Sequence, residues 1–514
     1  MKTKTILIAS SFALLASPAF ADINKARQAL INEMPIPELE NAMDSGAFTS
    51  VELTQASLER IKKYNGKLGA VLNINPDALS AAKAADAARK NGVKSPMLGI
   101  PILVKDNVDT LDKMPTTAGS LALKDNFTGR DNPAVAKLRA AGVIVLGKTN
   151  LSEWANMRGD SSISGWSGLG GQTHNPYDLK RTTCGSSSGT GAGVSASFAV
   201  IGIGSETDGS IICPSNMNGL VGLKPTVGLV SRTHVIPISA TQDTLGAMGR
   251  NVIDVAIMTN IMAGTDPLDS ATIDADNHKI DYSAAMGGAS LVGKRLGILR
   301  DNIGDNPKTN AAFNKTAEKL KAAGAILIEI PTNRLQQVNE GEGVVLHYEL
   351  KDGLNKYLAS TNSKMRTLKD LIAFNNANAD KELQFFGQED FIKAEATTGL
   401  DAPEYIHAIN RSHDLAGANL NILFETYKLD ALIGPSYGPA WLIDDIYGDQ
   451  YSGKSMSGMA AVAGFPHLSV PMGQVQGMPV GLSFIGKKWD EVGILSLGIA
   501  FENLGKMRQP PKLD

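Results

Sequence analysis

The chain has 514 residues, 43% of them hydrophobic and 20% charged, which is the composition of a folded globular protein and excludes extensive disorder. The 49 basic and 52 acidic residues give a net charge of −3, and neither sign gathers into a block, so we expect no nucleic-acid partner. Length alone would suggest about three domains. No linker or internal repeat divides the chain, however, and we expect one domain over residues 22–514.

The first 21 residues are typical of a secretory signal peptide. Lys2 and Lys4 precede an apolar run over residues 6–15, and Ala19-Phe20-Ala21 offers a small-x-small cleavage site. A membrane anchor is the alternative, but a span needs about 20 apolar residues and this run is much shorter. We therefore expect cleavage after Ala21 and a periplasmic or secreted protein without a membrane-spanning segment.

Helices open the expected mature chain, and short buried strands follow them. Thr49 and Glu52 form a capping box at the start of one helix, and a second helix begins near Asn75-Pro76 and runs to Lys90. Apolar runs bounded by Gly or Pro then alternate with helical stretches, which indicates buried strands of an α/β sheet. These runs cover residues 98–104, 143–146, 199–203, 296–299, 325–330 and 429–433. A polar helical region is expected over residues 333–427.

A segment rich in Gly and Ser covers residues 159–193. It is too long for an ordinary connection and too rich in glycine for a helix, so we expect a long functional loop. The run from Gly185 to Gly189 matches the G-x-S-x-G nucleophile elbow, with Ser187 at its centre. That motif needs a hydrophobic strand before it, and residues 177–183 are polar. A flexible Gly/Ser linker is the other simple explanation.

A second serine motif, residues 204–211, follows an apolar strand and is expected to form a tight turn. A serine in such a turn, here Ser210, can point into a cleft. The consecutive N–H groups of Thr207, Asp208, Gly209 and Ser210 can form a nest that stabilises an oxyanion. An ordinary strand-to-loop turn is the alternative.

A serine nucleophile needs a base, and two residue types are available. The seven histidines form no recognisable triad or metal-ligand spacing; they are His174, His234, His278, His347, His407, His413 and His467. Lys105 ends the apolar run at residues 98–104, where burial can lower the pKa of its amine enough to leave it neutral. A surface lysine paired with Asp106 is the alternative.

Cys184 and Cys213 are the two cysteines of the chain, and each lies close to one serine motif. An exported chain can oxidise such a pair, so a disulfide is one possibility. Two small buried thiols are the other, and we expect these, because bridging requires a Cα separation that the sequence does not provide.

The three motifs, in this order, resemble the amidase signature family over essentially the whole chain after residue 21. The resemblance is carried by residues 98–107, 116–120, 146–156, 182–191, 204–211, 222–226, 242–244 and 466–485. It implies an α/β fold in which α-helices cover both faces of a large, mixed, twisted β-sheet.

The resemblance also implies a mechanism. Lys105 corresponds to the base, Ser186 to a bridging serine held by a cis Gly185-Ser186 peptide bond, and Ser210 to the nucleophile. The backbone N–H groups of residues 207–210 correspond to the oxyanion hole. The implied activity is hydrolysis of carboxamides, with no cofactor and no metal.

Asp208 stands where this family usually has glycine, and Ile212 where it usually has arginine. Both departures are similar to the branch of bacterial peptide amidases, which release ammonia from C-terminal carboxamides of peptides. His174, however, stands where that branch suggests arginine. A broad-specificity amidase or esterase, an inactive amidase-like binding protein and a partner-dependent amidotransferase subunit remain alternatives. The expected partner is a small-molecule or peptide carboxamide, with no nucleic acid and no membrane, and the protein is expected to be a monomer or homodimer.

Overall fold

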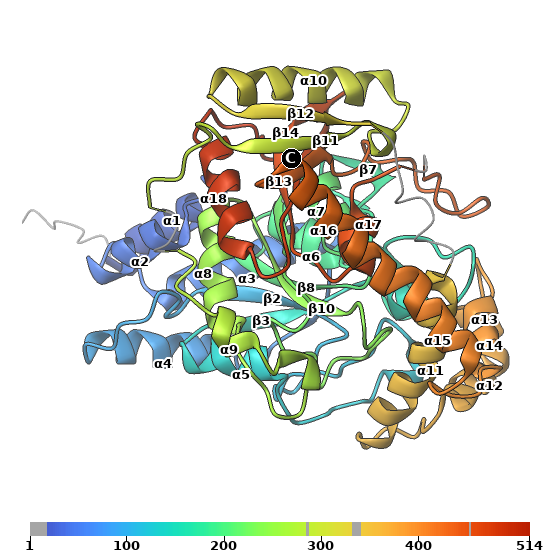
Figure 1. Cartoon of the computed structure of the whole chain (residues 1–514). Coiled ribbons are helices and arrows are strands. Elements are labelled where there is room, and N and C mark those ends of the chain that lie inside the picture. Colours follow the sequence, from blue (N-terminus) through green and yellow to red (C-terminus); the bar gives the residue numbers. More distant parts are fainter. Residues whose placement is uncertain (1–17, 284–286, 332–340, 452–453, 514) are drawn as a thin grey trace, which may run out of the picture.

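A computed structural model of the chain describes residues 18–283, 287–331, 341–451 and 454–513, and a large mixed β-sheet runs through its centre (Figure 1). The sheet has 11 strands in the order β1-β3-β2-β8-β10-β9-β14-β15-β13-β11-β12. Its strands are β1 (Val71–Ile74), β2 (Pro101–Lys105), β3 (Ile144–Thr149), β8 (Ile201–Glu206), β9 (Val221–Lys224), β10 (Thr244–Gly249), β11 (Arg295–Leu299), β12 (Ile326–Ile330), β13 (Ala431–Pro435), β14 (His467–Val475) and β15 (Met478–Ile485).

The sheet is parallel in two places and antiparallel elsewhere. β2 pairs in parallel with β3 and β8, and β11 pairs in parallel with β12 and β13. Every residue of β2, β3, β8, β9, β10, β13 and β15 is buried, as expected of strands that are covered on both faces. The fold implied by the family resemblance is therefore confirmed, and all six predicted strand segments belong to this sheet.

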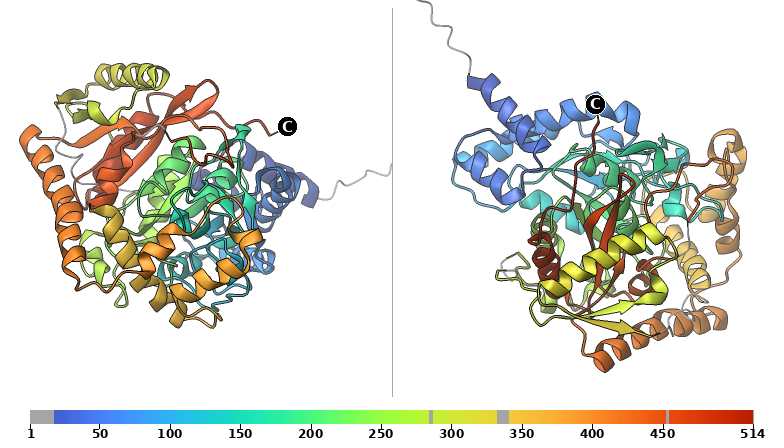
Figure 2. Two further views of the ribbon diagram at one scale, coloured as in Figure 1. Left: turned by 90° about the vertical axis from the view of Figure 1, so that its right-hand side faces the viewer. Right: turned by 90° about the horizontal axis from the view of Figure 1, so that it is seen from above.

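Helices surround the sheet, and α11 to α15 gather at one end of the molecule, at the lower right of Figure 1. Figure 2 shows the same crowding from two further directions. The helices are α1 (Pro18–Ile31), α2 (Ile36–Asp44), α3 (Ser50–Leu68), α4 (Ala78–Lys90), α5 (Pro133–Ala140), α6 (Ser188–Ser195), α7 (Ile212–Met217), α8 (Val252–Met262), α9 (Ala275–His278), α10 (Pro307–Ala322), α11 (Glu342–Ala359), α12 (Leu368–Ala377), α13 (Ala379–Glu382), α14 (Glu389–Glu395), α15 (Pro403–Ile409), α16 (Leu415–Tyr427), α17 (Ser457–Val462) and α18 (Glu491–Glu502).

Helix signals in the sequence identify the correct starting points. The Thr49 side chain accepts from the Glu52 backbone N–H at 3.2 Å, and the Glu52 carboxylate accepts from the Thr49 N–H at 2.8 Å, so the predicted capping box is present at the start of α3. The second predicted helix is α4. In the described ranges, none of the helices combines the length and the hydropathy that a membrane span requires.

The Gly/Ser-rich segment is not a loop throughout, and this part of the prediction was wrong. Its last residues form the wholly buried helix α6, preceded by the short strand pairs β4 (Trp166–Ser167) with β5 (Gly171–Gln172) and β6 (His174–Asn175) with β7 (Asp178–Thr182). A Cβ on Gly189 would lie 2.3 Å from the Ala70 carbonyl oxygen and 2.5 Å from that of Asn150. Glycine therefore lets this helix pack directly against neighbouring backbone, which outweighs its low helix propensity.

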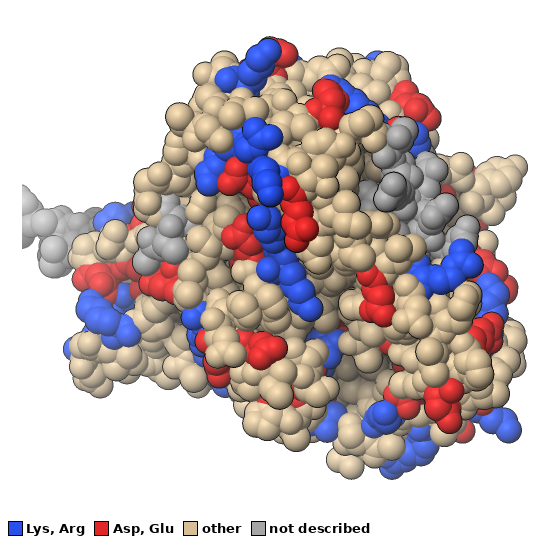
Figure 3. Space-filling view, viewed as in Figure 1, with Lys and Arg blue, Asp and Glu red and all other residues tan. Residues whose placement is uncertain are grey.

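The predicted signal peptide lies largely outside the described residues, and it stays a prediction. On the visible face of the molecule, acidic and basic side chains are interspersed, as their even distribution along the sequence suggests (Figure 3).

One ion pair lies in the interior beside β2 and β3. The Lys148 ammonium lies 3.3 Å from the Asp106 carboxylate and also donates to the Val108 carbonyl at 2.6 Å and to the Thr116 hydroxyl at 3.0 Å. Both charged side chains are completely buried. Removing one partner of such a pair leaves the other charge buried and uncompensated.

Lys148→Met is therefore expected to lower the free energy of unfolding by about 3–5 kcal/mol, measured by urea denaturation. Lys94→Met is the matched control, because Lys94 pairs with Asp44 at 2.6 Å on the surface and its side chain is 70% exposed. We expect that control to change the stability by less than about 1 kcal/mol. Equal losses in the two variants would contradict the assigned role of the buried pair.

Candidate active site

Lys105 is the last residue of β2, and its side chain is fully buried. A hydrogen bond joins its Nζ to Ser186 Oγ at 2.7 Å. The same nitrogen contacts the hydroxyl of Ser205 at 2.9 Å and its carbonyl oxygen at 3.2 Å. Asn107 donates to that hydroxyl at 2.9 Å. The amine is thus held among neutral oxygen atoms.

Burial lowers the pKa of the Lys105 amine from 10.5 to about 7, and the negative charges of Asp243 and Glu206 oppose this shift. A substantial fraction of the side chain is therefore neutral near physiological pH. The alternative of a surface lysine paired with Asp106 was wrong, since Asp106 pairs with Lys148 and Lys105 has no contact with solvent.

Ser186 follows a cis peptide bond between Gly185 and Ser186, as the family resemblance implied. Its hydroxyl is buried against Lys105, and its carbonyl oxygen accepts from the Ser152 N–H at 3.1 Å. A Cβ on Gly185 would lie only 2.0 Å from the Ser152 hydroxyl oxygen, so this close approach requires glycine.

Ser210 lies in the turn between β8 and α7, as the sequence predicts. The Glu206 carboxylate accepts from the N–H groups of Ile211 and Ile212, at 2.7 and 2.9 Å, and so ties the end of β8 to the start of α7. The Ser187 N–H donates to the Ser210 carbonyl at 3.2 Å, which brings the two serine motifs together. The Ser210 hydroxyl itself makes no hydrogen bond to any described residue, and the residue keeps 7% of its surface exposed.

The backbone N–H groups of Thr207, Asp208, Gly209 and Ser210 likewise find no acceptor among the described residues. They are the four consecutive groups that the sequence suggests as an anion nest. Such unsatisfied donors beside a free serine hydroxyl can stabilise the negative charge of a tetrahedral intermediate.

Ser187 does not fit the nucleophile-elbow hypothesis. It is fully buried, and its hydroxyl donates to the Ser205 carbonyl at 3.1 Å. No histidine is bonded to any of these serines within the described ranges. The buried His467, for example, contacts Ser483 at 2.6 Å, and burial lowers the pKa of this histidine to about 3. A histidine-dependent esterase centred on Ser187 therefore has no structural basis.

The expectation of two free thiols was wrong. Cys184 and Cys213 form a disulfide, with Cα atoms 5.8 Å apart. The bond connects the residue before Gly185 to the first turn of α7, three positions after Ser210. This correction follows from three-dimensional proximity, because the two serine motifs converge although the cysteines are 29 positions apart in the sequence.

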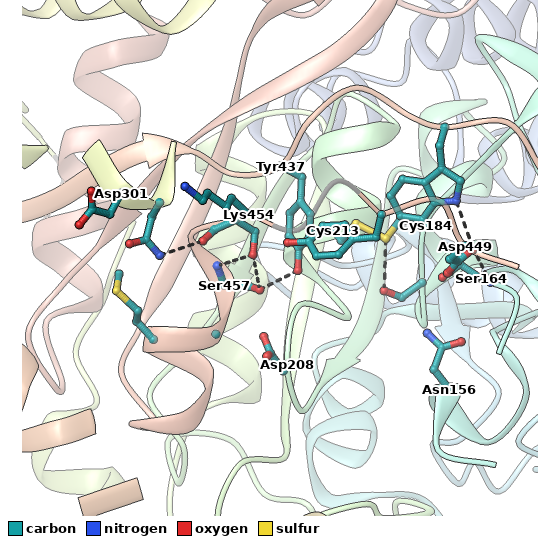
Figure 4. Close-up of a pocket in the computed structure, with 17 residues that line it drawn as sticks. Asn156, Ser164, Cys184, Asp208, Cys213, Asp301, Tyr437, Asp449, Lys454 and Ser457 are labelled. Carbon is teal, nitrogen blue, oxygen red and sulfur yellow. Dashed lines mark hydrogen bonds between the residues drawn. A yellow bond between two sulfur atoms is a disulfide. The ribbon is translucent and has the colours of Figure 1, made fainter. Parts of the chain in front are cut away.

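A pocket of about 490 Å³ adjoins these loops, and the disulfide forms part of its wall (Figure 4). Gly185 and Asp208 contribute to the same wall. Three aromatic side chains, Tyr437, Trp441 and Tyr451, come from the segment after β13, and further lining residues come from α17 and from the ends of other elements. The volume matches that of ordinary small-ligand pockets.

Asp208, one of the two departures from the family pattern, lines this pocket. Burial raises the pKa of the Asp208 carboxyl, because it removes the carboxylate from water. Hydrogen bonding to Ser457 and the positive charge of Lys224 act in the opposite direction. Ile212, the other departure, is fully buried beneath the turn. Within the described ranges, no group of three or more His, Cys, Asp or Glu side chains is arranged to hold a metal ion.

The family resemblance placed Lys105, Ser186 and Ser210 in one site. The structure shows Lys105 in contact with Ser186, and it brings the loops of the two serines together. Sequence reasoning missed the supporting residues Ser205 and Asn107. Ser205 lies inside the second serine motif, directly before Glu206. Its position near the end of a predicted strand could have indicated that it lies close to the end of the neighbouring strand, where Lys105 is.

Comparisons with known proteins identify the family of the chain. The amidase family model matches residues 52–495. A probable amidase of Arabidopsis thaliana is 36% identical over 520 residues, covering 99% of this chain and 97% of that protein. A glutamyl-tRNA(Gln) amidotransferase subunit from Thermoanaerobacter pseudethanolicus is 31% identical, covering 93% of this chain and 98% of that protein.

Among solved structures, the native peptide amidase of Stenotrophomonas maltophilia is 43% identical, with a TM-score of 0.88 over 94% of this chain and 99% of that one. The structure of the peptide amidase PAM with the competitive inhibitor chymostatin gives 44% identity and a TM-score of 0.90, over 93% and 99%. The chain belongs to the amidase signature family, and it is an amidase.

Proposed function

We propose that this amidase hydrolyses C-terminal carboxamides of peptides, with Ser210 as nucleophile, Ser186 as the bridging acid and base, and Lys105 as the terminal base. The observation that carries the proposal is the 2.7 Å contact between Ser186 and a fully buried lysine whose pKa is lowered to about 7. A neutral amine in that position can accept a proton, which a surface lysine cannot do near neutral pH.

In this mechanism Lys105 takes the proton of Ser186 while Ser186 takes that of Ser210. Ser210 Oγ then attacks the carboxamide carbon. The N–H groups of residues 207–210 receive the developing oxyanion. The relay runs backward to protonate the leaving nitrogen, ammonia departs, and water releases the acyl group from Ser210 by the same route.

The preference for peptide amides rests on similarity and on the pocket. The peptide amidase of Stenotrophomonas maltophilia covers nearly the whole chain at 43% identity. Aromatic walls and a volume of about 490 Å³ suit a peptide side chain next to the reacting amide. Asp208 and Ile212, at the positions that set this branch apart, lie in the pocket wall and beneath the turn respectively.

We further propose that the protein is exported through its N-terminal signal. The disulfide between Cys184 and Cys213 supports this, because disulfides persist in oxidising compartments outside the cytoplasm. A partner-dependent amidotransferase component is the second candidate, favoured by the similarity to the glutamyl-tRNA(Gln) amidotransferase of Thermoanaerobacter pseudethanolicus. Release of ammonia from an amidated peptide by the purified chain alone distinguishes the two.

Ser210→Ala is expected to reduce kcat for ammonia release on the order of 10⁴-fold or more, because the attacking oxygen is lost. A fluorophosphonate probe should label Ser210 in the wild-type protein, as mapped by peptide mass spectrometry. Ser187→Ala serves as the control that leaves the probe target in place. Labelling at Ser187 instead of Ser210 would refute the proposed nucleophile.

The pH dependence of kcat/KM tests the role of Lys105. Since the neutral amine is the active form, kcat/KM should rise about tenfold per pH unit below the lysine pKa of about 7 and level off above it. An N-acetylated peptide amide without ionisable side chains keeps the substrate from titrating. Lys105→Ala should lower the rate about 10²- to 10⁴-fold and abolish this limb. A limb that persists in the variant would assign the titration to another group.

Reduction of the disulfide tests whether the link between the two serine loops positions the reacting groups. Dithiothreitol should lower kcat/KM of the wild-type protein about 10- to 100-fold, since small displacements of reacting groups cost that much. Reoxidation should restore it. The double variant Cys184→Ala with Cys213→Ala provides the control, because the reductant has nothing further to break there. Unchanged activity after both thiols have been titrated would show that the bond is dispensable for catalysis.

A further inference from the structure

Asn156 is the last of three consecutive residues with left-handed backbone conformation. The φ angles of Trp154, Ala155 and Asn156 are 50°, 55° and 71°. Such angles are uncommon for residues other than glycine, and they cluster where a structure must present a particular group. Asparagine tolerates this conformation better than most residues.

Buried contacts anchor the segment on both sides of Asn156. The Trp154 ring packs edge-on against Phe391, with centroids 5.4 Å apart. Glu153 and Arg158 form an ion pair at 2.9 Å, and both side chains are completely buried. Contacts with the interior therefore anchor the segment on both sides of Asn156.

Asn156 lines the pocket, together with Cys184 and Gly185 of the loop that leads to Ser186 (Figure 4). A Cβ on Gly185 would lie 3.5 Å from Asn156 Nδ2, so this amide is a neighbour of the loop that carries Ser186. Among the described residues, neither its oxygen nor its nitrogen has a hydrogen-bond partner, and the oxygen is buried. It is the one residue lining this pocket with a buried polar side-chain atom that is unpaired within the described ranges.

An unpaired buried amide is costly, and native structures keep such groups where a ligand satisfies them. The side-chain oxygen can accept an N–H, and it has no partner within the described part of the chain. A carboxamide substrate presents N–H donors next to its reacting carbon. The corresponding ester has the same shape there but no N–H.

We propose that Asn156 is a specificity-determining residue that accepts a hydrogen bond from the N–H of the scissile carboxamide and so selects amides over esters. The inference rests on the proposed function, since it requires the substrate amide to lie between Asn156 and Ser186. Removing the acceptor leaves amide hydrolysis weakened and ester hydrolysis nearly unchanged.

The test measures kcat/KM for a peptide amide and for the methyl ester of the same peptide. Asn156→Gly removes the side chain and suits the left-handed backbone, so the variant is expected to fold. The ratio of amide to ester kcat/KM should fall about 10- to 100-fold, the usual effect of losing one hydrogen bond in a buried site. Asn156→Asp keeps an acceptor oxygen and the backbone preference, and it should retain most of the wild-type ratio.

Asn302 supplies the matched control. It lines the same pocket, but its amide already donates to the Ser455 carbonyl at 3.3 Å. Asn302→Ala should leave the amide-to-ester ratio unchanged. Equal losses of amide and ester activity in Asn156→Gly would overturn the proposal, because they would indicate a contact common to both substrates.

Binding to the Ser210→Ala protein separates this inference from the proposed function. Isothermal titration should show a Kd for the peptide amide that increases about 10- to 100-fold when Asn156→Gly is added, whereas the Kd of the ester stays constant. An unchanged Kd for the amide would overturn the role of Asn156 even in an active enzyme. A wild-type protein that binds the amide through Asn156 without hydrolysing it would instead refute the proposed function alone.

Discussion

The chemistry proposed for this protein depends on a lysine that is buried without a carboxylate in direct contact. The interior holds a second lysine close by, and the contrast between them is instructive. Lys148, on β3, lies 3.3 Å from Asp106, whereas Lys105, at the end of the adjacent β2, meets only the oxygens of serines. Burial therefore lowers the pKa of Lys105 to about 7, and more distant carboxylates keep it from falling further. A carboxylate at hydrogen-bond distance would stabilise the charged amine and remove the base.

Sheet topology explains why these particular residues meet. β2 and β8 are parallel neighbours, with Ile102 opposite Ile201 and Val104 opposite Ile203, so both strands end at the same edge. Lys105 ends one strand, and the turn that carries Ser210 follows the other. Ligands bind at the carboxyl ends of parallel strands for this geometric reason. The glycine-rich α6 packs directly against this edge and brings Ser186 to its start.

The parts of the fold that the sequence predicts well are those with strong local signals. Six apolar runs identified strands, and Thr49 with Glu52 marked the start of α3 correctly. Helix α6 was missed because its propensity is poor, and its stability comes from close packing that only glycine permits, as Gly189 against Ala70 illustrates. The disulfide was missed for a related reason: whether two cysteines meet is decided by how distant segments pack, and no local pattern encodes that.

The proposed reacting groups lie in local sequence motifs, whereas the pocket is formed by the packing of distant segments. Lys105 and Ser210 each sit in a short motif that is ambiguous by itself, and the family resemblance joins them with Ser186 in one proposed site. The pocket walls come from segments far apart in the chain, including the aromatic segment after β13 and the residues around Asn156, and no spacing rule relates them. The disulfide connects the serine motifs with the pocket, because Cys184 and Cys213 join the two serine loops and also form part of the pocket wall. In the proposed mechanism, the two covalently joined loops thus carry the reacting serines and also line the pocket.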